Sequence, residues 1–143
     1  MALYFAYGSN LDRVQMARRC PGSRPLYRAE LEQHRLAFTG AQRGVATVRR
    51  DPWSVTPGVI YSVTRADLQA LDGYEGHPWC YTRAEMALVL EDGRMALAWV
   101  YVKRDTSPHE PQATYLQIIK AAYHRLAFDL RTLKDAVEEA VGI

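Results

Sequence analysis

Glu75 occupies a position from which its carboxylate could act as a general acid or base. Thr64 and Asp67 have the spacing of a helical capping box, and Leu68 marks the buried face of the helix that follows. Glu75 comes two helical turns after Leu68, which predicts that its side chain projects toward the protein interior. Burial would raise the pKa of this carboxyl group and allow proton exchange near neutral pH. If Gly73 ends the helix instead, Glu75 lies in solvent, and the spacing leaves both outcomes open.

A turn early in the chain is the second candidate site. It consists of Tyr7, Gly8, Ser9 and Asn10. The turn follows an apolar run at 3–6, which is expected to be a buried strand. It precedes a helix predicted over 10–19, with Asn10 as the N-cap and Pro21-Gly22 as the stop. Because glycine admits close approach and a helix start presents unpaired N–H groups, the turn could bind a carboxylate, a phosphate or an oxyanion, although an ordinary capped turn has the same sequence.

Ser9 is interpreted as a hydrogen-bonding residue of this turn, not as a nucleophile. A nucleophilic serine needs a base such as histidine. The four histidines lie in unrelated contexts, at His34, His77, His109 and His124. They also lack the spacing of metal ligands, so no metal site is expected.

The remaining chemically distinctive side chains are cysteines and aromatic residues. Cys20 and Cys80 are too few for a disulfide framework or a cysteine-rich zinc site, and both are expected to be buried packing thiols. Five aromatic residues could line a pocket, although core packing is their commoner role. They are Trp79, Tyr81, Trp99, Tyr101 and Tyr115.

The composition is that of one ordinary globular domain, spanning 1–143. The chain has 143 residues, of which 48% are apolar and 24% charged, which excludes disordered and fibrous classes. The longest apolar stretches, such as 95–102, fall far short of the ~20 residues of a membrane helix. No basic region precedes the first apolar run, so no secretory signal is expected. We therefore expect a soluble, cytoplasmic protein that does not associate with membranes.

Positive charge is concentrated in the first third of the chain. Residues 1–50 carry nine Arg and three acidic residues, a net +6, whereas 51–143 carry nine Lys and Arg and thirteen acidic residues, a net −4. The arginines are scattered and no nucleic-acid-binding motif accompanies them, so a solvated basic face is favoured over an RNA partner. A basic half could also favour a small anionic substrate.

The local patterns predict an α+β protein with a mostly antiparallel sheet. Short strands bounded by Gly or Pro are expected at 34–39, 45–48 and 58–63. Asp92-Gly93 predicts a hairpin joining 82–90 to 95–102. Two amphipathic helices are expected over 115–126 and 130–140, the second capped by Asp129. The fold expected is a small β-barrel or a curled sheet with flanking helices.

Three segments together resemble the gamma-glutamylcyclotransferase-like family. Phe5 to Leu11, with the sequence FAYGSNL, is similar to the opening signature of that family. Gly58 to Tyr61, followed by Leu71 to Gly76, resembles its catalytic segment. Pro111 to Leu116 is similar to its Pro-x-x-x-Tyr-Leu element. The segments occur in the family's order and span nearly the whole chain.

The resemblance implies a fold, a reaction and site residues. The fold is a small β-barrel with flanking helices and a cavity at one end, and the reaction releases 5-oxoproline and an amine or amino acid from a small gamma-glutamyl compound. Glu75 would be the catalytic acid/base, Tyr7 to Asn10 the substrate-binding turn, and Tyr81 and Tyr115 further substrate-binding residues. The implied chemistry needs no cofactor. The alternative is a non-catalytic binding or regulatory module on the same fold, and the motifs leave monomer or homodimer open.

Overall fold

The computed structural model describes residues 1–142, in which five strands close into a barrel. The strands are β1 (Ala2–Ala6), β2 (Arg24–Thr39), β3 (Val45–Val63), β4 (Tyr81–Leu90) and β5 (Met95–Lys103). They follow the order β1-β3-β2-β4-β5, with β1 and β5 parallel where the barrel closes and the other neighbours antiparallel. The predicted α+β class is confirmed, and the sheet is a closed barrel, not an open curled sheet.

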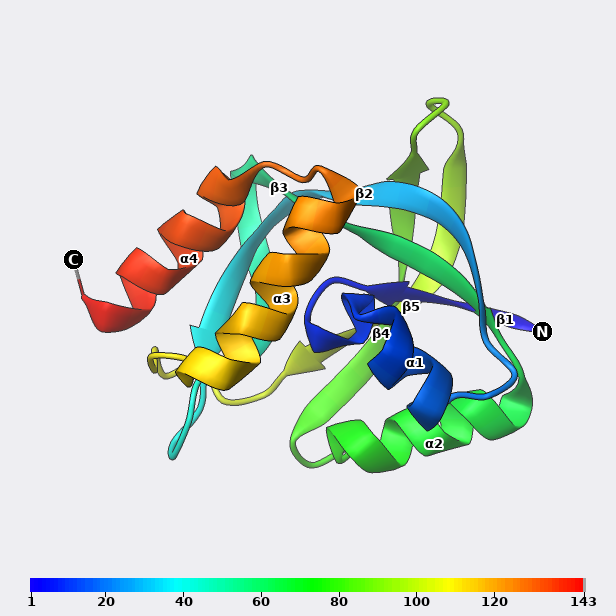
Figure 1. The fold of residues 1–143 in the computed structure, drawn as a ribbon, viewed down its shortest axis with the longest axis horizontal. Coiled ribbons are helices and arrows are strands. Elements are labelled where there is room, and N and C mark those ends of the chain that lie inside the picture. Colours follow the sequence, from blue (N-terminus) through cyan, green and yellow to red (C-terminus); the bar gives the residue numbers. More distant parts are fainter. Residues whose placement is uncertain (143) are drawn as a thin grey trace.

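Helices flank this barrel (Figure 1). In the described range they are the short 3-10 helix η1 (Ser9–Leu11) and the α-helices α1 (Arg13–Arg19), α2 (Arg65–Glu75), α3 (Ala113–Leu126) and α4 (Leu130–Val141). Helices α1 and α2 lie side by side, α3 contacts η1, and α4 packs against β2. None of the helices described is long and apolar enough to traverse a lipid bilayer.

Strands β2 and β3 are longer than the sequence predicts. The structure has two continuous strands in place of the three short ones expected at 34–39, 45–48 and 58–63. The expectation that Gly or Pro bounds each strand is wrong at Gly58, which lies inside β3. A Cβ at this position would stand 2.3 Å from the Ala6 carbonyl oxygen and 2.6 Å from the Phe5 ring. Gly58 therefore permits β1 to approach β3 closely and does not end a strand.

Every strand contributes apolar side chains to the core. Side chains with at most 1% exposure include Phe5, Phe38, Ile60, Leu88 and Val100, one from each strand. The helices add Met16 of α1, Leu71 of α2, Ile119 of α3 and Leu133 of α4. A core shared by all strands gives the loops and helix ends at the rim of the barrel a rigid support.

Helix α1 begins later than the sequence predicts. Asp12, not Asn10, is its N-cap, because the Asp12 carboxylate accepts a hydrogen bond from the Gln15 backbone N–H at 3.0 Å. Asn10 is buried within η1, where its side chain is already hydrogen-bonded. The predicted cap at Asn10 is therefore wrong, although the helix ends at Arg19 as expected.

The predicted starts of α2 and α4 are confirmed, and α3 begins two residues before the predicted 115. Thr64 and Asp67 form a complete capping box at the start of α2, and the Asp129 carboxylate caps α4. Helix α2 continues through Gly73 to Glu75 and ends at Gly76, which adopts the left-handed conformation with φ of 65°. Glu75 is thus held on the last helical turn, and it does not lie in a solvated loop.

Ala127 occupies a backbone conformation that favours glycine. It is the C-cap of α3, with φ of 56° and ψ of 37°. Left-handed conformations cost a non-glycine residue about 1 kcal/mol or more. We therefore expect Ala127→Gly to raise the free energy of unfolding by about 0.5–1 kcal/mol, measured by urea denaturation. Ala121→Gly, at an exposed interior position of the same helix, should instead lower it by about 1 kcal/mol, and equal effects from both variants would contradict the argument.

Candidate active site

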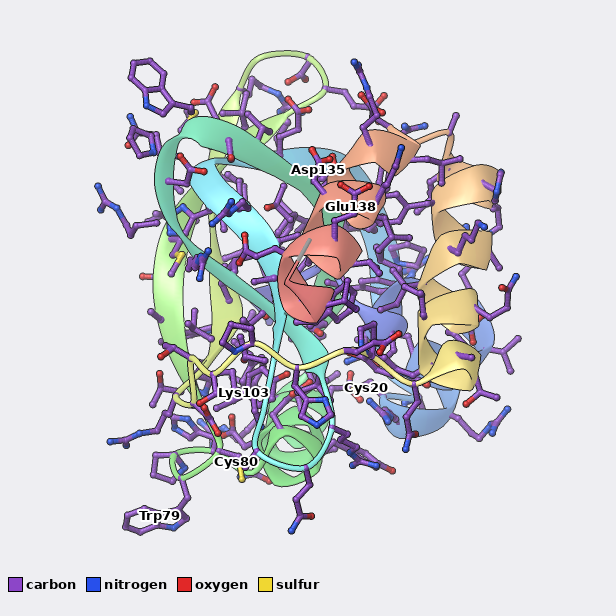
Figure 2. All side chains as sticks on the ribbon, turned by 90° about the vertical axis from the view of Figure 1, so that its left-hand side faces the viewer. Cys20, Trp79, Cys80, Lys103, Asp135 and Glu138 are labelled. Carbon is purple, nitrogen blue, oxygen red and sulfur yellow. The ribbon has the colours of Figure 1, made fainter. Side chains whose placement is uncertain are left out.

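A cavity of about 730 Å³ opens at one end of the molecule. Its walls include the Tyr7–Asn10 turn, the 40–44 loop with the first residues of β3, and the 73–76 end of α2. Figure 2 shows three other lining residues, Trp79, Cys80 and Lys103, gathered at this end. The two segments that the sequence singled out, distant along the chain, therefore face one cavity.

Among the carboxyl groups that line this cavity, that of Glu75 is the one whose pKa is raised. Glu75 is partly buried, and burial raises the pKa of its carboxyl group from 4.5 to about 7. The positive charges of Arg19 and Lys103 act in the opposite direction. Among the described residues no hydrogen-bond donor contributes to this shift, so the carboxylate oxygens remain available to a ligand. A carboxyl group with this pKa can both accept and release a proton near neutral pH.

The Tyr7–Asn10 turn places main-chain atoms at the cavity wall. Gly8 precedes η1, and a Cβ on it would lie 3.0 Å from the Ala46 Cβ and 3.9 Å from the Tyr115 hydroxyl oxygen. A side chain at this position would therefore fill space between the turn and β3. The first turn of η1 leaves backbone N–H groups without helical acceptors, which suits the binding of a carboxylate or an oxyanion.

Side chains from η1 and α1 hold the turn in place. The Asn10 side-chain nitrogen donates to the Tyr4 hydroxyl at 2.9 Å, and the Arg19 guanidinium donates to the Asn10 side-chain oxygen Oδ1 at 3.1 Å. The Gln15 amide nitrogen donates to the Ser9 hydroxyl oxygen at 2.8 Å and to Asn10 at 3.0 Å. Ser9 thus takes part in the network that orders the turn.

Three of the tyrosines predicted for the site line the cavity with their hydroxyl groups bound to backbone. Tyr7 donates to the Tyr101 carbonyl oxygen at 2.5 Å and Tyr81 to the Ala46 carbonyl oxygen at 2.7 Å. The Tyr115 hydroxyl accepts from the Ala46 N–H at 2.9 Å. Burial raises the pKa of Tyr115 to about 12 and that of Tyr7 and Tyr81 well above the ordinary value. All three phenols are therefore neutral at physiological pH and shape the cavity as fixed polar groups.

Of the five aromatic residues that could line a pocket or pack in the core, four line the cavity, and two of these, Tyr81 and Tyr101, also belong to the buried core. Trp79, Tyr81, Tyr101 and Tyr115 line the cavity. Trp99 does not: it is half-buried on β5, and the Arg83 guanidinium lies over its ring, 4.3 Å from the ring centroid. The sequence reasoning missed Arg19 and Lys103, which also line the cavity. Arg19 could have been found from its four-residue spacing to Gln15 on the helix that follows the turn.

The two cysteines have different environments. Cys20 is buried, its thiol lies 3.6 Å from the Asp67 carbonyl oxygen, and burial raises its pKa to about 11. This confirms a packing role for Cys20. Cys80 is exposed, so its predicted burial is wrong: it lies in the surface turn before β4 and borders the open cavity. Within residues 1–142 no group of three His, Cys, Asp or Glu side chains is arranged to bind a metal ion.

Fold and cavity together define a class of protein: a small α+β barrel with flanking helices, in which a carboxyl group of near-neutral pKa and a glycine-containing turn line one cavity. The family model described as "Gamma-glutamyl cyclotransferase, AIG2-like" matches residues 4–124. The chain belongs to this family.

Individual relatives agree with that assignment. The chain is 28% identical over 126 residues to human gamma-glutamylcyclotransferase, covering 82% of this chain and 67% of that protein. The bovine gamma-glutamylcyclotransferase is 27% identical over the same shares. A solved gamma-glutamyl cyclotransferase structure superimposes with a TM-score of 0.84 at 24% identity, covering 99% of this chain and 87% of that one, which establishes a shared fold.

Proposed function

We propose that this protein cyclises a small gamma-glutamyl amide, releasing 5-oxoproline and an amine or amino acid. The observation that supports this most strongly is that Glu75, with a pKa of about 7, shares one cavity with the Tyr7–Asn10 turn. The family assignment and the names of the relatives are consistent with this class of reaction.

The substrate supplies its own nucleophile in this reaction, so no Ser or Cys nucleophile is needed. The ionised Glu75 carboxylate accepts a proton from the substrate α-ammonium, and the freed nitrogen attacks the γ-carbonyl carbon. A bond forms between this nitrogen and the γ-carbon, and negative charge develops on the carbonyl oxygen. When the intermediate collapses, the original amide C–N bond breaks.

The protons balance without an outside acid or base. One ammonium proton remains on the lactam nitrogen. Glu75 accepts a second before the attack and delivers it to the departing nitrogen once the ring has closed, and it then transfers the third from the ring nitrogen to the departing nitrogen in the same way. The product amine leaves protonated and Glu75 returns to its ionised form. General acid–base assistance of this kind typically contributes ~10²–10⁴-fold in rate.

The cavity assists by holding the substrate in a folded conformation. Bringing amine and carbonyl into contact contributes up to ~7–11 kcal/mol in well-oriented intramolecular reactions. The N–H groups of the Tyr7–Asn10 turn bind either the substrate α-carboxylate or the developing oxyanion. Arg19 adds positive charge to the same wall.

The reaction is tested by incubating the protein with gamma-glutamyl amino acids and gamma-glutamyl amines and detecting 5-oxoproline by mass spectrometry. Product formation supports the proposal, and the preferred leaving group identifies the substrate. Binding of these compounds by calorimetry without product would favour the non-catalytic binding module instead.

The pH dependence of the reaction should report the ionisation of Glu75. Since the ionised carboxylate is the base, kcat/KM is expected to rise with pH through about 7 and to level off above it. Lys103→Gln removes a cation that lowers the Glu75 pKa, so this variant should move the rise to higher pH. The matched control is Lys120→Gln, an exposed lysine on α3, which should leave the profile unchanged. A profile that is flat between about pH 5 and 8 would contradict the assignment.

A further inference from the structure

Tyr101 connects the two halves of the proposed site. It lies on β5 with only 2% of its surface exposed. Its hydroxyl donates to the Asp72 carboxylate at 2.6 Å, and its backbone carbonyl accepts the Tyr7 hydroxyl at 2.5 Å. Tyr101 is therefore hydrogen-bonded both to the helix that carries Glu75 and to the Tyr7–Asn10 turn.

Asp72 transmits this connection to Glu75. It lies three residues before Glu75 on α2, and its backbone carbonyl accepts the N–H groups of Gly76 and His77, which end the helix. Its carboxylate also accepts the Arg83 guanidinium at 2.9 Å. Hydrogen bonds to the Asp72 carboxylate thus link the last turn of α2 to both β4 and β5.

We propose that Tyr101, acting through Asp72, is a positioning residue that holds the Glu75 carboxylate at a fixed place relative to the Tyr7 turn. This inference rests on the proposed function. Proton transfer and ring closure require the reacting groups to be placed within a fraction of an ångström, and a displacement of about 1 Å can cost ~10²-fold in rate. The hydroxyl proton of Tyr101 is already donated to Asp72, so the residue acts through that bond, not as a catalytic residue.

The ring of Tyr101 is fixed as well as its hydroxyl. It makes edge contacts with Tyr4 at 5.9 Å and with His77 at 6.5 Å between centroids. Tyr101→Phe would keep these contacts and remove only the hydrogen bond to Asp72. The substitution therefore isolates the positioning bond.

The chain offers a matched control in Tyr123. This tyrosine of α3 is fully buried, and its hydroxyl has no hydrogen-bond partner in the described chain. Tyr123→Phe removes a buried hydroxyl of the same kind away from the cavity and should leave kcat unchanged. It accounts for any general effect of a Tyr-to-Phe change in the core.

Steady-state kinetics of 5-oxoproline formation should show a selective loss in kcat. We expect Tyr101→Phe and Asp72→Asn each to lower kcat by ~10–100-fold while KM stays within about threefold, and the double variant to be no slower than the slower single variant. A kcat equal to that of the wild type, a loss confined to KM, or additive losses would each overturn the proposal.

A second readout separates failure of this inference from failure of the proposed function. The titration of the Glu75 carboxyl carbon is followed by NMR, which needs no turnover. Tyr101→Phe should lower the Glu75 pKa toward its ordinary value, because the released helix end lets the carboxylate reach solvent. Tyr123→Phe should not change this titration. An unchanged Glu75 titration in Tyr101→Phe overturns the positioning role whether or not the wild type forms 5-oxoproline.

Discussion

Replacing Glu75 with glutamine should remove nearly all 5-oxoproline formation while leaving the fold intact. The amide has the size and shape of the carboxylate but cannot accept a proton, so the rate should fall by ~10²–10⁴-fold. The loss is measured as kcat by mass-spectrometric detection of 5-oxoproline. The matched control is Glu85→Gln, an exposed glutamate on β4, which should retain wild-type activity. Activity of Glu75→Gln within a few-fold of wild type would remove Glu75 from the mechanism.

The stability of the Glu75→Gln variant should also differ from that of the wild type, by an amount that depends on pH. Burial raises the Glu75 pKa from 4.5 to about 7, so the folded wild type binds a proton that the unfolded chain has released, and its stability falls as pH rises between these values. Glutamine does not ionise and escapes this loss. Above pH 7 the variant should therefore be more stable than wild type by about 2–3 kcal/mol, and near pH 4 the difference should vanish. Denaturant unfolding at the two pH values measures it.

Gly8→Val should weaken substrate binding by ~10–100-fold. Its Cβ would stand 3.0 Å from the Ala46 Cβ, and the two methyl groups beyond it would enter the space between the turn and the Tyr115 hydroxyl. Crowding of this size typically costs ~1–3 kcal/mol, which corresponds to a ~10–100-fold weaker Kd. Calorimetry with a gamma-glutamyl substrate in the inactive Glu75→Gln background gives the affinity without turnover.

Gly8→Ala provides a graded comparison, because it adds the Cβ without the methyl groups. It should weaken binding less than Gly8→Val. Circular dichroism and thermal unfolding establish that both variants retain the barrel. An unchanged Kd in a folded Gly8→Val variant would show that the turn does not contact the substrate.

Structural features that depend on residues close together in the sequence could be predicted without the structure. The capping box of Thr64 and Asp67 and the cap at Asp129 are hydrogen bonds between residues at most three positions apart, so their spacing alone predicted the helix starts. The Asp92-Gly93 hairpin is local in the same sense. The helical spacing from Leu68 likewise indicated on which side of α2 Glu75 would lie.

Two of the errors, at Gly58 and Asn10, arose because the same residue type can serve two purposes. Gly58 has the same local signature whether it ends a strand or admits a neighbouring one, and only the crossing of β1 decides between them. Asn10 and Asp12 are both competent helix caps. Asn10 is engaged by Tyr4 and Arg19, which leaves the cap to Asp12.

The amino-acid sequence by itself therefore determined the family, the fold class and the two segments that line the cavity. Each of these is encoded in motifs and periodicities that are a few residues long. Closure of the barrel decided the rest. It placed Arg19 and Lys103 beside Glu75, raised the pKa of that carboxyl group by burial, and joined Tyr101 to Asp72 across 29 positions of sequence. These features depend on distances in space between segments far apart in the chain, and such distances exist only once the strands have paired.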